Sequence, residues 1–339
     1  MIHKLPTLPL VRAVRLAGAA LLLGILAGCS TAPSALEPQG PAAAEIAGLS
    51  RLLFVMGGAV YLAVMGFLGV ALLRRSRRQG AYDEQERRTG NRILTAGVTL
   101  TVVILLVVFG FTVSTQVALS LPAKAGDLTI RVIGRQWWWE VQYPTQQITT
   151  ANEIHIPVGR PVKIELLSED VIHSFWVPEL HGKLDMIPGE TNVFWIEADH
   201  AGDYWGLCAE FCGMQHAKMQ FLVVAVPPEE YDAWVARQQQ PARPPADDLA
   251  ARGQEVFLGG SCIYCHTISG TDATGRLGPD LTHLASRRTL GAGALPNNRG
   301  NLGGWVVDSQ HIKPGNLMPA TAISGDDLQA LLAYLEGLH

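Results

Sequence analysis

The sequence predicts a multidomain membrane protein in which a two-helix transmembrane hairpin is followed by an all-β Greek-key domain and then by an all-α domain. Three observations predict this organisation. The chain has 339 residues, which is enough for two or three domains. Its hydrophobic share of 48%, its charged share of 17% and its mean hydropathy of +0.18 are typical of a membrane protein with water-exposed parts. After residue 121, long apolar stretches give way to short β-rich runs.

Charge divides the chain in the same way. Residues 1–117 hold eleven Lys and Arg against five Asp and Glu, a net charge of +6. Residues 118–339 hold fifteen against twenty-five, a net charge of −10. A basic membrane-facing half and an acidic outer half argue against a nucleic-acid partner and favour a basic protein partner on the outer side.

The N-terminal residues 1–28 have the pattern of a signal peptide. A charged start precedes thirteen apolar residues, Leu16 to Gly28, which are too few to span a bilayer. The stretch ends in Leu26-Ala-Gly-Cys29, which resembles the cleavage box of bacterial lipoproteins and predicts a lipid on Cys29. The alternative is an ordinary signal peptide followed by a chance cysteine.

Two longer apolar stretches predict membrane-spanning helices. Leu52 to Leu73 gives 22 uncharged residues and Ile93 to Leu121 gives 29, and about 20 suffice to span a bilayer. The segment between them carries seven arginines, so the positive-inside rule places it in the cytoplasm and everything after Leu121 outside. Buried helices of a soluble core are the weaker alternative. The predicted hairpin covers 48–121, with spans at about 50–73 and 93–116 and a cytoplasmic loop at 74–92.

A β-rich region is predicted at 122–237. Its runs of β-branched and aromatic residues are separated by Gly and Pro, which is typical of a β-sandwich or Greek-key barrel. The runs are 128–133, 153–156, 162–166, 193–196 and 221–226.

One segment of this region carries soft metal ligands. Two thiols, an imidazole and a thioether follow one another in Cys208, Cys212, His216 and Met219, and a second imidazole, His173, lies 35 residues before Cys208. Thiolate and thioether favour copper over magnesium or calcium. Two thiolates on one loop can bridge two coppers, each with one His, in a centre for one-electron transfer. A disulfide and a tetrahedral zinc site are the alternatives.

A second cofactor motif lies in the region predicted at 247–339, after a Pro-rich linker at 238–246. Cys262-Ile-Tyr-Cys265-His266 is the attachment pattern for c-type haem, in which both thiols bind the porphyrin and the His ligates iron. A domain of about 90 residues with a terminal helix near 326–338 favours haem over a redox or zinc role for the two cysteines.

The sixth iron ligand follows by elimination. Met318 is the only methionine after Met219, and a His/Met pair raises the haem potential as in electron carriers. His283 and His311 are the competitors; the first is expected to be a packing or surface residue and the second to lie in a polar loop. All five cysteines then have a use, and no disulfide remains to be explained.

These motifs together resemble subunit II of the haem-copper cytochrome c oxidases. The resemblance rests on the segment from Cys208 to Met219, His173 in His-Ser-Phe-Trp, Asp185-Met-Ile-Pro-Gly189 and the aromatic Gln136-Trp-Trp-Trp-Glu140. It implies a cupredoxin-like fold and a dinuclear copper A centre. The ligands that it implies are the side chains of His173, Cys208, Cys212, His216 and Met219 and the backbone carbonyl of Glu210.

The same resemblance implies three further features. The Glu210 side chain would help to bind magnesium at the border with subunit I, and Trp137 would be the point of electron entry. The alternative for the three consecutive tryptophans is that they are partly core and partly interface residues. The fused C-terminal domain is similar to class I cytochromes c, as in caa-type oxidases. One departure from the family pattern is Asn91-Arg92, where some members have a carboxylate, and Glu86 receives no role.

The function implied by the resemblance is electron entry into a respiratory oxidase of the bacterial inner membrane. A cytochrome c-type donor would reduce the covalent haem, and electrons would pass through copper A to subunit I, with subunit III in the same proton-translocating complex. Three rivals remain: a quinol oxidase subunit lacking copper, a nitrous-oxide reductase, and a structural or zinc-binding lipoprotein.

Overall fold

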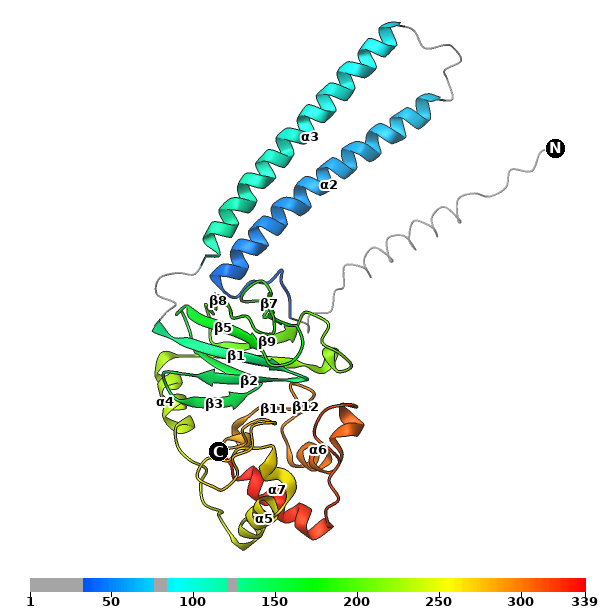
Figure 1. The fold of residues 1–339 in the computed structure, drawn as a ribbon. Helices are drawn as coiled ribbons and strands as arrows, with labels where there is room; N and C mark the ends of the chain where they lie inside the picture. Colours follow the sequence, from blue (N-terminus) through cyan, green and yellow to red (C-terminus); the bar gives the residue numbers. More distant parts are fainter. Residues whose placement is uncertain (1–32, 76–83, 121–126) are drawn as a thin grey trace, which may run out of the picture. The chain divides into compact units, whose positions relative to one another are not determined.

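The computed structural model describes residues 33–75, 84–120 and 127–339. The predicted signal peptide and Cys29 lie outside these described residues, as do residues 76–83 of the predicted cytoplasmic loop. Two long helices, a β-sandwich and a smaller helical domain (residues 247–339) follow one another along the chain (Figure 1). The order of the three parts is the one that the sequence predicts.

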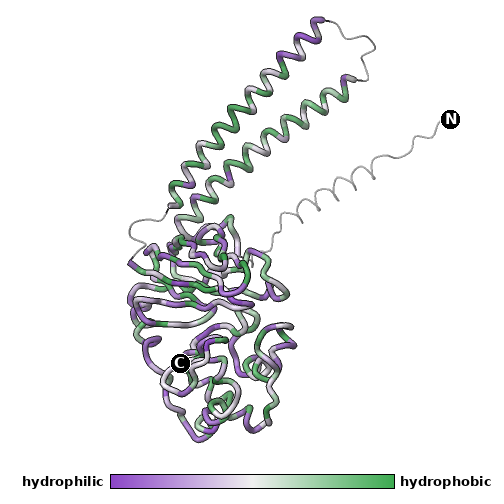
Figure 2. Tube along the Cα trace, in the orientation of Figure 1, coloured by the Kyte–Doolittle hydropathy of each residue, from purple (hydrophilic) through white to green (hydrophobic). Residues whose placement is uncertain are grey.

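Helices α2 (Pro41–Arg75) and α3 (Glu84–Ala118) are long and apolar enough to cross a membrane. Both helices are apolar along most of their length (Figure 2). No residue in the most apolar window of either helix is buried within the protein. A core helix of a soluble protein would bury such a surface, so these helices have the exposed apolar surface that a bilayer covers. Both helices extend several residues beyond the predicted spans.

The outer ends of the two helices are tied to the β-sandwich by main-chain contacts. The amide of Ala43, in the first turns of α2, donates to the carbonyl of Leu180 at 3.2 Å. The indole of Trp195 donates to the carbonyl of Leu119, just after α3, at 3.1 Å. Ala42, Ala43 and Trp195 are buried there.

The β-sandwich has two five-stranded sheets with the orders β3-β2-β1-β5-β8 and β4-β10-β9-β6-β7. Strand β1 runs parallel to β5 and β4 runs parallel to β10, while the other pairs are antiparallel. Neighbours that are distant in sequence are expected of a Greek-key arrangement. The strands are β1 Thr129–Arg135, β2 Trp138–Tyr143, β3 Ile148–Ala151, β4 Glu153–Pro157, β5 Val162–Ser168, β6 His173–Trp176, β7 Leu184–Met186, β8 Asn192–Ile196, β9 Gly202–Cys208 and β10 Gln220–Val226.

Aromatic side chains fill the space between the sheets near the predicted copper ligands. Phe175 and Phe221 stack with ring centroids 4.4 Å apart, and Trp139 meets Phe221 edge-on at 4.9 Å. Gly206 makes room for this cluster, because a Cβ there would lie 2.1 Å from the Phe221 ring. The rigid packing fixes the strands from which the candidate ligands project.

After β10, helix α4 (Pro228–Gln238) packs on the sandwich, where Trp234 stacks on His155 at 4.4 Å. The segment predicted as a linker follows and contacts the helical domain, since Ala242 donates to the carbonyl of Ser269. The helical domain contains α5 Asp248–Gly259, η3 Ser261–Tyr264, η4 Leu284–Ser286, α6 Arg299–Ile312, α7 Gly325–Glu336 and a short hairpin of β11 Thr289–Leu290 and β12 Leu295–Pro296.

Helices α5 and α7 cross closely at a glycine. A Cβ on Gly253 would lie 2.0 Å from the carbonyl oxygen of Ala330, so no larger residue fits this crossing. Asp247 and Ser324 cap the N-termini of the two helices by accepting main-chain N–H groups. The crossing joins the two ends of the helical domain and closes its core around the segment that carries the Cys-x-x-Cys-His motif.

Candidate metal and haem sites

Two neighbouring strands and one loop assemble the candidate copper ligands. Cys208 ends β9, and β9 pairs with β6 so that Phe175 lies opposite Cys208. His173 begins β6 and therefore reaches the same end of the sheet. The loop after Cys208 passes through the 3-10 turn η2 (His216–Lys218) and returns at Met219 to begin β10.

The donor atoms of these residues converge. The Sγ atoms of Cys208 and Cys212 are 3.8 Å apart, far longer than the roughly 2.05 Å of a disulfide, and both cysteines are free. The Nδ1 atom of His173 lies 3.9 Å from the first sulphur. The Nδ1 atom of His216 and the Sδ atom of Met219 each lie 3.8 Å from the second. In this structure the two sulphurs are thus separate donors and are not joined in a disulfide.

The donor set fits a soft metal. The nearest donors of His173, Cys208 and Cys212 lie within 4.8 Å of one another, and all three residues are buried. The carbonyl oxygen of Glu210 lies 3.3 Å from the Cys208 sulphur and adds a weak donor. Two thiols, two imidazoles, a thioether and a carbonyl fit copper, although the four Cys and His donors alone would also suit zinc.

The two thiols divide their acidity between them. The adjacent Cys212 thiol, with help from His173 and nearby main chain, lowers the pKa of Cys208 to about 3, although burial opposes this. The resulting thiolate raises the pKa of Cys212, and burial acts in the same direction. Cys208 is therefore the more acidic of the two thiols, and a metal held by both sulphurs would bind them as thiolates.

Asp170 orients His173 and was not identified from the sequence. Its carboxylate accepts a 2.8 Å hydrogen bond from Nε2 of His173, which leaves Nδ1 facing the thiols. Burial opposes ionisation of Asp170, but hydrogen bonds from His173 and from the amides of Val171 and Gln136 lower its pKa. The signal in the sequence was a carboxylate three residues before a ligand His. Gly134 completes the setting, since a Cβ there would lie 2.7 Å from the imidazole.

Replacing Asp170 with Asn tests this role. Because an amide oxygen holds the imidazole less firmly and leaves it less basic, we expect D170N to weaken copper binding about 10-fold to 100-fold. The measurement is copper retained per chain against graded concentrations of a competing chelator. Asp232→Asn on the exposed face of α4 is the matched control and should retain copper as the wild type does. Equal retention by both variants would show that Asp170 does not support the site.

The Glu210 side chain forms an ion pair with a lysine. Its carboxylate lies 3.4 Å from the amine of Lys183, which also contacts Asp185 at 3.2 Å. These three side chains are about half exposed. Carboxylates of Glu210 and Asp185 on one face provide the hard oxygen ligands that magnesium prefers, with Lys183 as their present partner.

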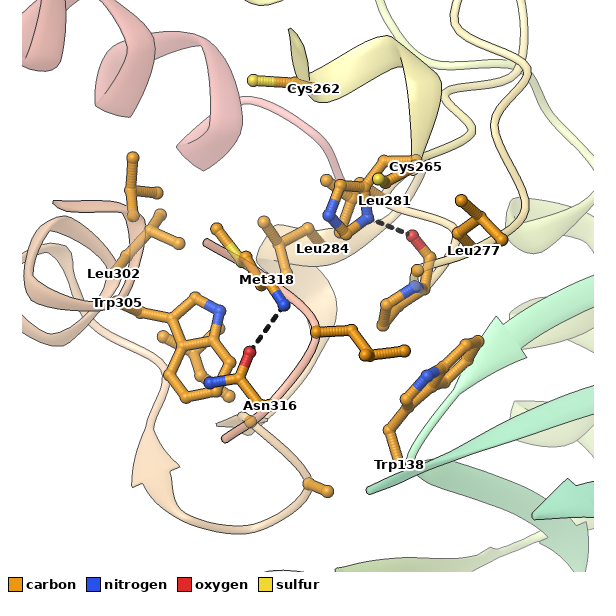
Figure 3. Close-up of a pocket in the computed structure, with 18 of the residues that line it drawn as sticks. Trp138, Cys262, Cys265, Leu277, Leu281, Leu284, Leu302, Trp305, Asn316 and Met318 are labelled. Atoms are coloured by element: carbon orange, nitrogen blue, oxygen red, sulfur yellow. Dashed lines mark hydrogen bonds between the residues drawn. The ribbon is translucent and has the colours of Figure 1, made fainter. Parts of the chain in front are cut away.

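A cavity of about 560 Å³ surrounds the predicted haem residues. Cys262, Cys265, His266 and Met318 all line it, and leucines make up much of its wall (Figure 3). The size and the apolar lining are those of a cofactor pocket with a few convergent polar groups. The four residues that the sequence assigns to haem therefore meet in one place.

His266 is prepared as an iron ligand. Its Nδ1 atom donates a 2.7 Å hydrogen bond to the carbonyl of Pro279, because a carbonyl can only accept, and Nε2 is left free (Figure 3). Burial lowers the pKa of His266, so the ring is neutral, as a ligand must be. Gly278 lies against the ring, where a Cβ would be 2.7 Å from Cε1.

The Met318 segment faces the cavity and is held by hydrogen bonds. The Met318 amide donates to Oδ1 of Asn316 at 2.7 Å (Figure 3). The Met318 carbonyl accepts from Ser309 and Gln310. His283 and His311 do not line the cavity. His283 is buried with Nε2 3.1 Å from the carbonyl of Gln240, as expected of a packing residue. His311 was expected in a polar loop, but it lies exposed in the last turn of α6.

A buried cation also fits haem. Arg287 lines the cavity, is almost fully buried and leaves its Nε atom without a hydrogen-bond partner in the described part of the chain. Haem carries two propionate carboxylates, and a buried guanidinium needs such a partner. The thiols, the free imidazole nitrogen, the thioether and this guanidinium together match the chemistry of a c-type haem.

The three consecutive tryptophans occupy different places. Trp137 donates from its indole to the carbonyl of Cys212 at 3.0 Å, and Gln136 donates to the same oxygen at 2.8 Å. Trp138 lines the haem cavity from the β-sandwich side (Figure 3). Trp139 is fully buried in the core. Core and cavity-lining positions are thus both present among the three tryptophans. Trp137 is the one hydrogen-bonded to the loop 208–219, called the copper loop below.

Comparisons with known proteins agree with this architecture. A family model described as cytochrome c oxidase subunit II, periplasmic domain, matches residues 144–226, and one described as cytochrome c matches residues 250–339. Cytochrome c oxidase subunit 2 of Alkalihalophilus pseudofirmus is 38% identical over 312 residues, which cover 90% of each chain. The Bacillus subtilis protein of the same name is 33% identical over 342 residues, covering 94% of this chain and 96% of its own.

Among solved structures, the periplasmic domain of cytochrome oxidase subunit II of Bradyrhizobium japonicum is 31% identical, with a TM-score of 0.34. The match covers 35% of this chain and 96% of that one. Because relatives more than 30% identical match nearly the whole length and the two family models match its outer parts in order, the chain belongs to the cytochrome c oxidase subunit II family, carries its own cytochrome c domain, and is a subunit of a haem-copper oxidase.

Proposed function

We propose that this chain is the electron-entry subunit of its oxidase, with a covalent haem c and a dinuclear copper A centre as its two carriers. Each carrier supplies one-electron transfer without a bond being made or broken. Electrons from a cytochrome c-type donor would enter at the haem, continue to copper A and leave for subunit I, where oxygen is reduced to water in a complex that includes subunit III and translocates protons.

The observation that carries this proposal is the pair of unbonded, facing thiols with an imidazole beside each. Cys208 and Cys212 would bridge two coppers, with His173 and His216 as terminal ligands and Met219 and the Glu210 carbonyl as weak ones. All of these ligands would come from protein, and His173, Cys208, Cys212 and Met219 are buried, so the coppers would have no position left for a substrate. A quinol oxidase subunit without the copper ligands does not account for this convergence.

The haem side of the proposal rests on the cavity. Cys262 and Cys265 would form the two thioether bonds, His266 would ligate iron through Nε2, and Met318 would be the sixth ligand. A His/Met ligand pair raises the haem potential, which suits an electron carrier. Arg287 would neutralise a propionate.

Further assignments follow the family and are proposed with these. Trp137 would mediate electron entry to the copper loop, and Glu210 would contribute to a magnesium site facing subunit I. The proposed arrangement is a hairpin in the bacterial inner membrane, with the copper domain at 122–237, the linker at 238–246 and the haem domain at 247–339 on the periplasmic side. Residues 1–28 would be removed and Cys29 lipidated.

The test is a visible and near-infrared spectrum of the purified full chain, with copper and iron quantified. We expect two coppers and one iron per chain, low-spin c-haem bands and a near-infrared copper band. Iron without copper would contradict the copper part of the proposal. Zinc in a colourless protein would contradict electron transfer altogether and support the structural alternative.

A further inference from the structure

A buried lysine joins the helical domain to the β-sandwich. Lys313 follows α6 and is 2% exposed, which is rare for an amine. Its Nζ atom donates to the carbonyl of Trp137 in the sandwich at 2.8 Å and to the carbonyl of Gly291 in its own domain at 2.9 Å. One side chain therefore bridges the two parts of the chain that hold the candidate carriers.

Both ends of this bridge lead directly to candidate ligands. On the haem side, the Lys313 carbonyl accepts from the side chain of Asn316, whose Oδ1 atom accepts the amide of Met318. On the copper side, the indole of Trp137 donates to the carbonyl of Cys212. The connection from the Met318 segment to the copper loop thus needs only Asn316, Lys313 and Trp137, joined by hydrogen bonds of 2.7 to 3.0 Å.

Two contacts flank the bridge on the copper loop. Gln215, next to His216, donates to the carbonyl of Pro314 at 2.7 Å. Lys218 donates to the carbonyl of Ile312 at 2.6 Å. The segment 312–314 therefore lies along the copper loop. Each of its three residues makes a hydrogen bond to the β-sandwich, through the carbonyls of Ile312 and Pro314 and the amine of Lys313.

A second strip of contacts holds the β11–β12 hairpin to the sandwich. The buried carboxylate of Glu153 accepts the amide of Arg288 at 2.6 Å, and the Arg288 side chain pairs with Asp203. The amide of Gln220 donates to the carbonyl of Ala292 at 3.0 Å. Polar groups on both sides are thus satisfied across the contact, as in a specific interface.

We propose that Lys313 is a positioning residue that keeps the haem domain docked on the copper domain, so that electrons pass between the two carriers without the domain swinging on its linker. This inference rests on the proposed function, because it assigns a geometry to the transfer between haem and copper A. One electron leaves ferrous haem iron and enters the oxidised copper pair, and no proton moves. Lys313 is neither oxidised nor reduced.

The chemistry of the amine explains why its loss matters. Burial lowers the pKa of Lys313 to about 7, yet the charged and the neutral amine both have N–H groups for the two carbonyls. A methionine at this position fills similar volume but leaves the carbonyls of Trp137 and Gly291 buried without donors. The penalty for such groups corresponds to a loss of docking on the order of tenfold to a hundredfold.

The test uses the full chain assembled in its oxidase. Haem oxidation and copper reduction are followed after rapid reduction of the haem, in the wild type and in Lys313→Met. We expect the variant to transfer electrons at least tenfold more slowly and to become sensitive to solvent viscosity, since its domain must dock first. Copper content and haem content should stay at wild-type values, which separates a positioning role from damage to either site. The haem midpoint potential is measured alongside, because Lys313 also lines the haem cavity.

Two further variants complete the design. Lys163→Met, in a half-buried ion pair with Glu165 on β5 and remote from the helical domain's contact, is the matched control and should behave as the wild type. Lys313→Gln keeps N–H donors on a shorter side chain and should transfer electrons at an intermediate rate. If the methionine variant fails to take up haem, the rate of Lys313→Gln tests the docking role instead. Wild-type rates without viscosity dependence in a fully loaded Lys313 variant would overturn the inference.

Proteolysis of the linker at 238–246 gives a readout that does not need the cofactors to exchange electrons. This segment is largely exposed already, but both of its ends are held while the two domains stay docked. Undocking lets it move into a protease active site, so Lys313→Met should be cut faster than Lys163→Met. Equal cutting would overturn the inference. A wild-type chain without copper would instead overturn the proposed function, and the cutting rates would still decide whether Lys313 docks the domain.

Discussion

Replacing Cys212 with Ser is expected to remove the copper pair and stop electron delivery beyond the haem. The Cys212 sulphur lies 3.8 Å from the donor atoms of three other candidate ligands, Cys208, His216 and Met219. A serine oxygen cannot replace a bridging thiolate, so the loss of copper binding exceeds the 10-fold to 100-fold expected when a residue that only orients a ligand, such as Asp170, is replaced. We expect no near-infrared band, less than one copper per chain, and a rate of copper-dependent haem oxidation reduced more than 100-fold.

The matched control is the same substitution in the other motif. Cys262→Ser removes one thioether attachment in the helical domain and should leave two coppers and their near-infrared band in place. Low-spin haem bands should in turn persist in Cys212→Ser, because the two sites have separate ligands. Retention of both coppers in Cys212→Ser would contradict the bridging assignment.

Replacing Met318 with Ala is expected to have the largest effect on the haem. The thioether is the only methionine sulphur that lines the cavity among the described residues, and its loss leaves iron with His266 as its one protein ligand. Since the axial ligands set the potential, we expect the midpoint to fall by on the order of 100 mV or more and the low-spin spectrum to be lost. A redox titration followed at the haem bands measures both.

Histidine at position 311 provides the comparison. It was one of the two competing ligands in the sequence, with His283, and it lies exposed outside the cavity, so His311→Ala should keep the wild-type potential and spectrum. A low-spin spectrum that survives in Met318→Ala but is lost in the double variant with His311→Ala would assign the sixth ligand to His311 instead.

Strand prediction succeeded where hydrophobic residues form a run. The five runs identified from the sequence correspond to β1, β4, β5, β8 and β10, within two residues at each end. Strands β2, β3, β6, β7 and β9 were missed. Among them, β9 contains two glycines and β6 begins with His173, so neither shows the alternation of apolar residues on which such predictions depend. Pairing with neighbouring strands fixes their conformation instead.

The sequence by itself determined the chemistry that depends on local spacing. The lengths of the apolar stretches, the attachment motif from Cys262 to His266 and the loop from Cys208 to Met219 place their donors within a few residues of one another, so backbone geometry alone brings those donors together. Tertiary structure decided what depends on distant segments: the hydrogen bond from His173 to Asp170, and the bridge from Lys313 to Trp137, 176 residues away in sequence. Sheet register and domain docking create such contacts through burial and hydrogen bonding between distant segments, and the sequence of neither segment indicates which residue will be its partner.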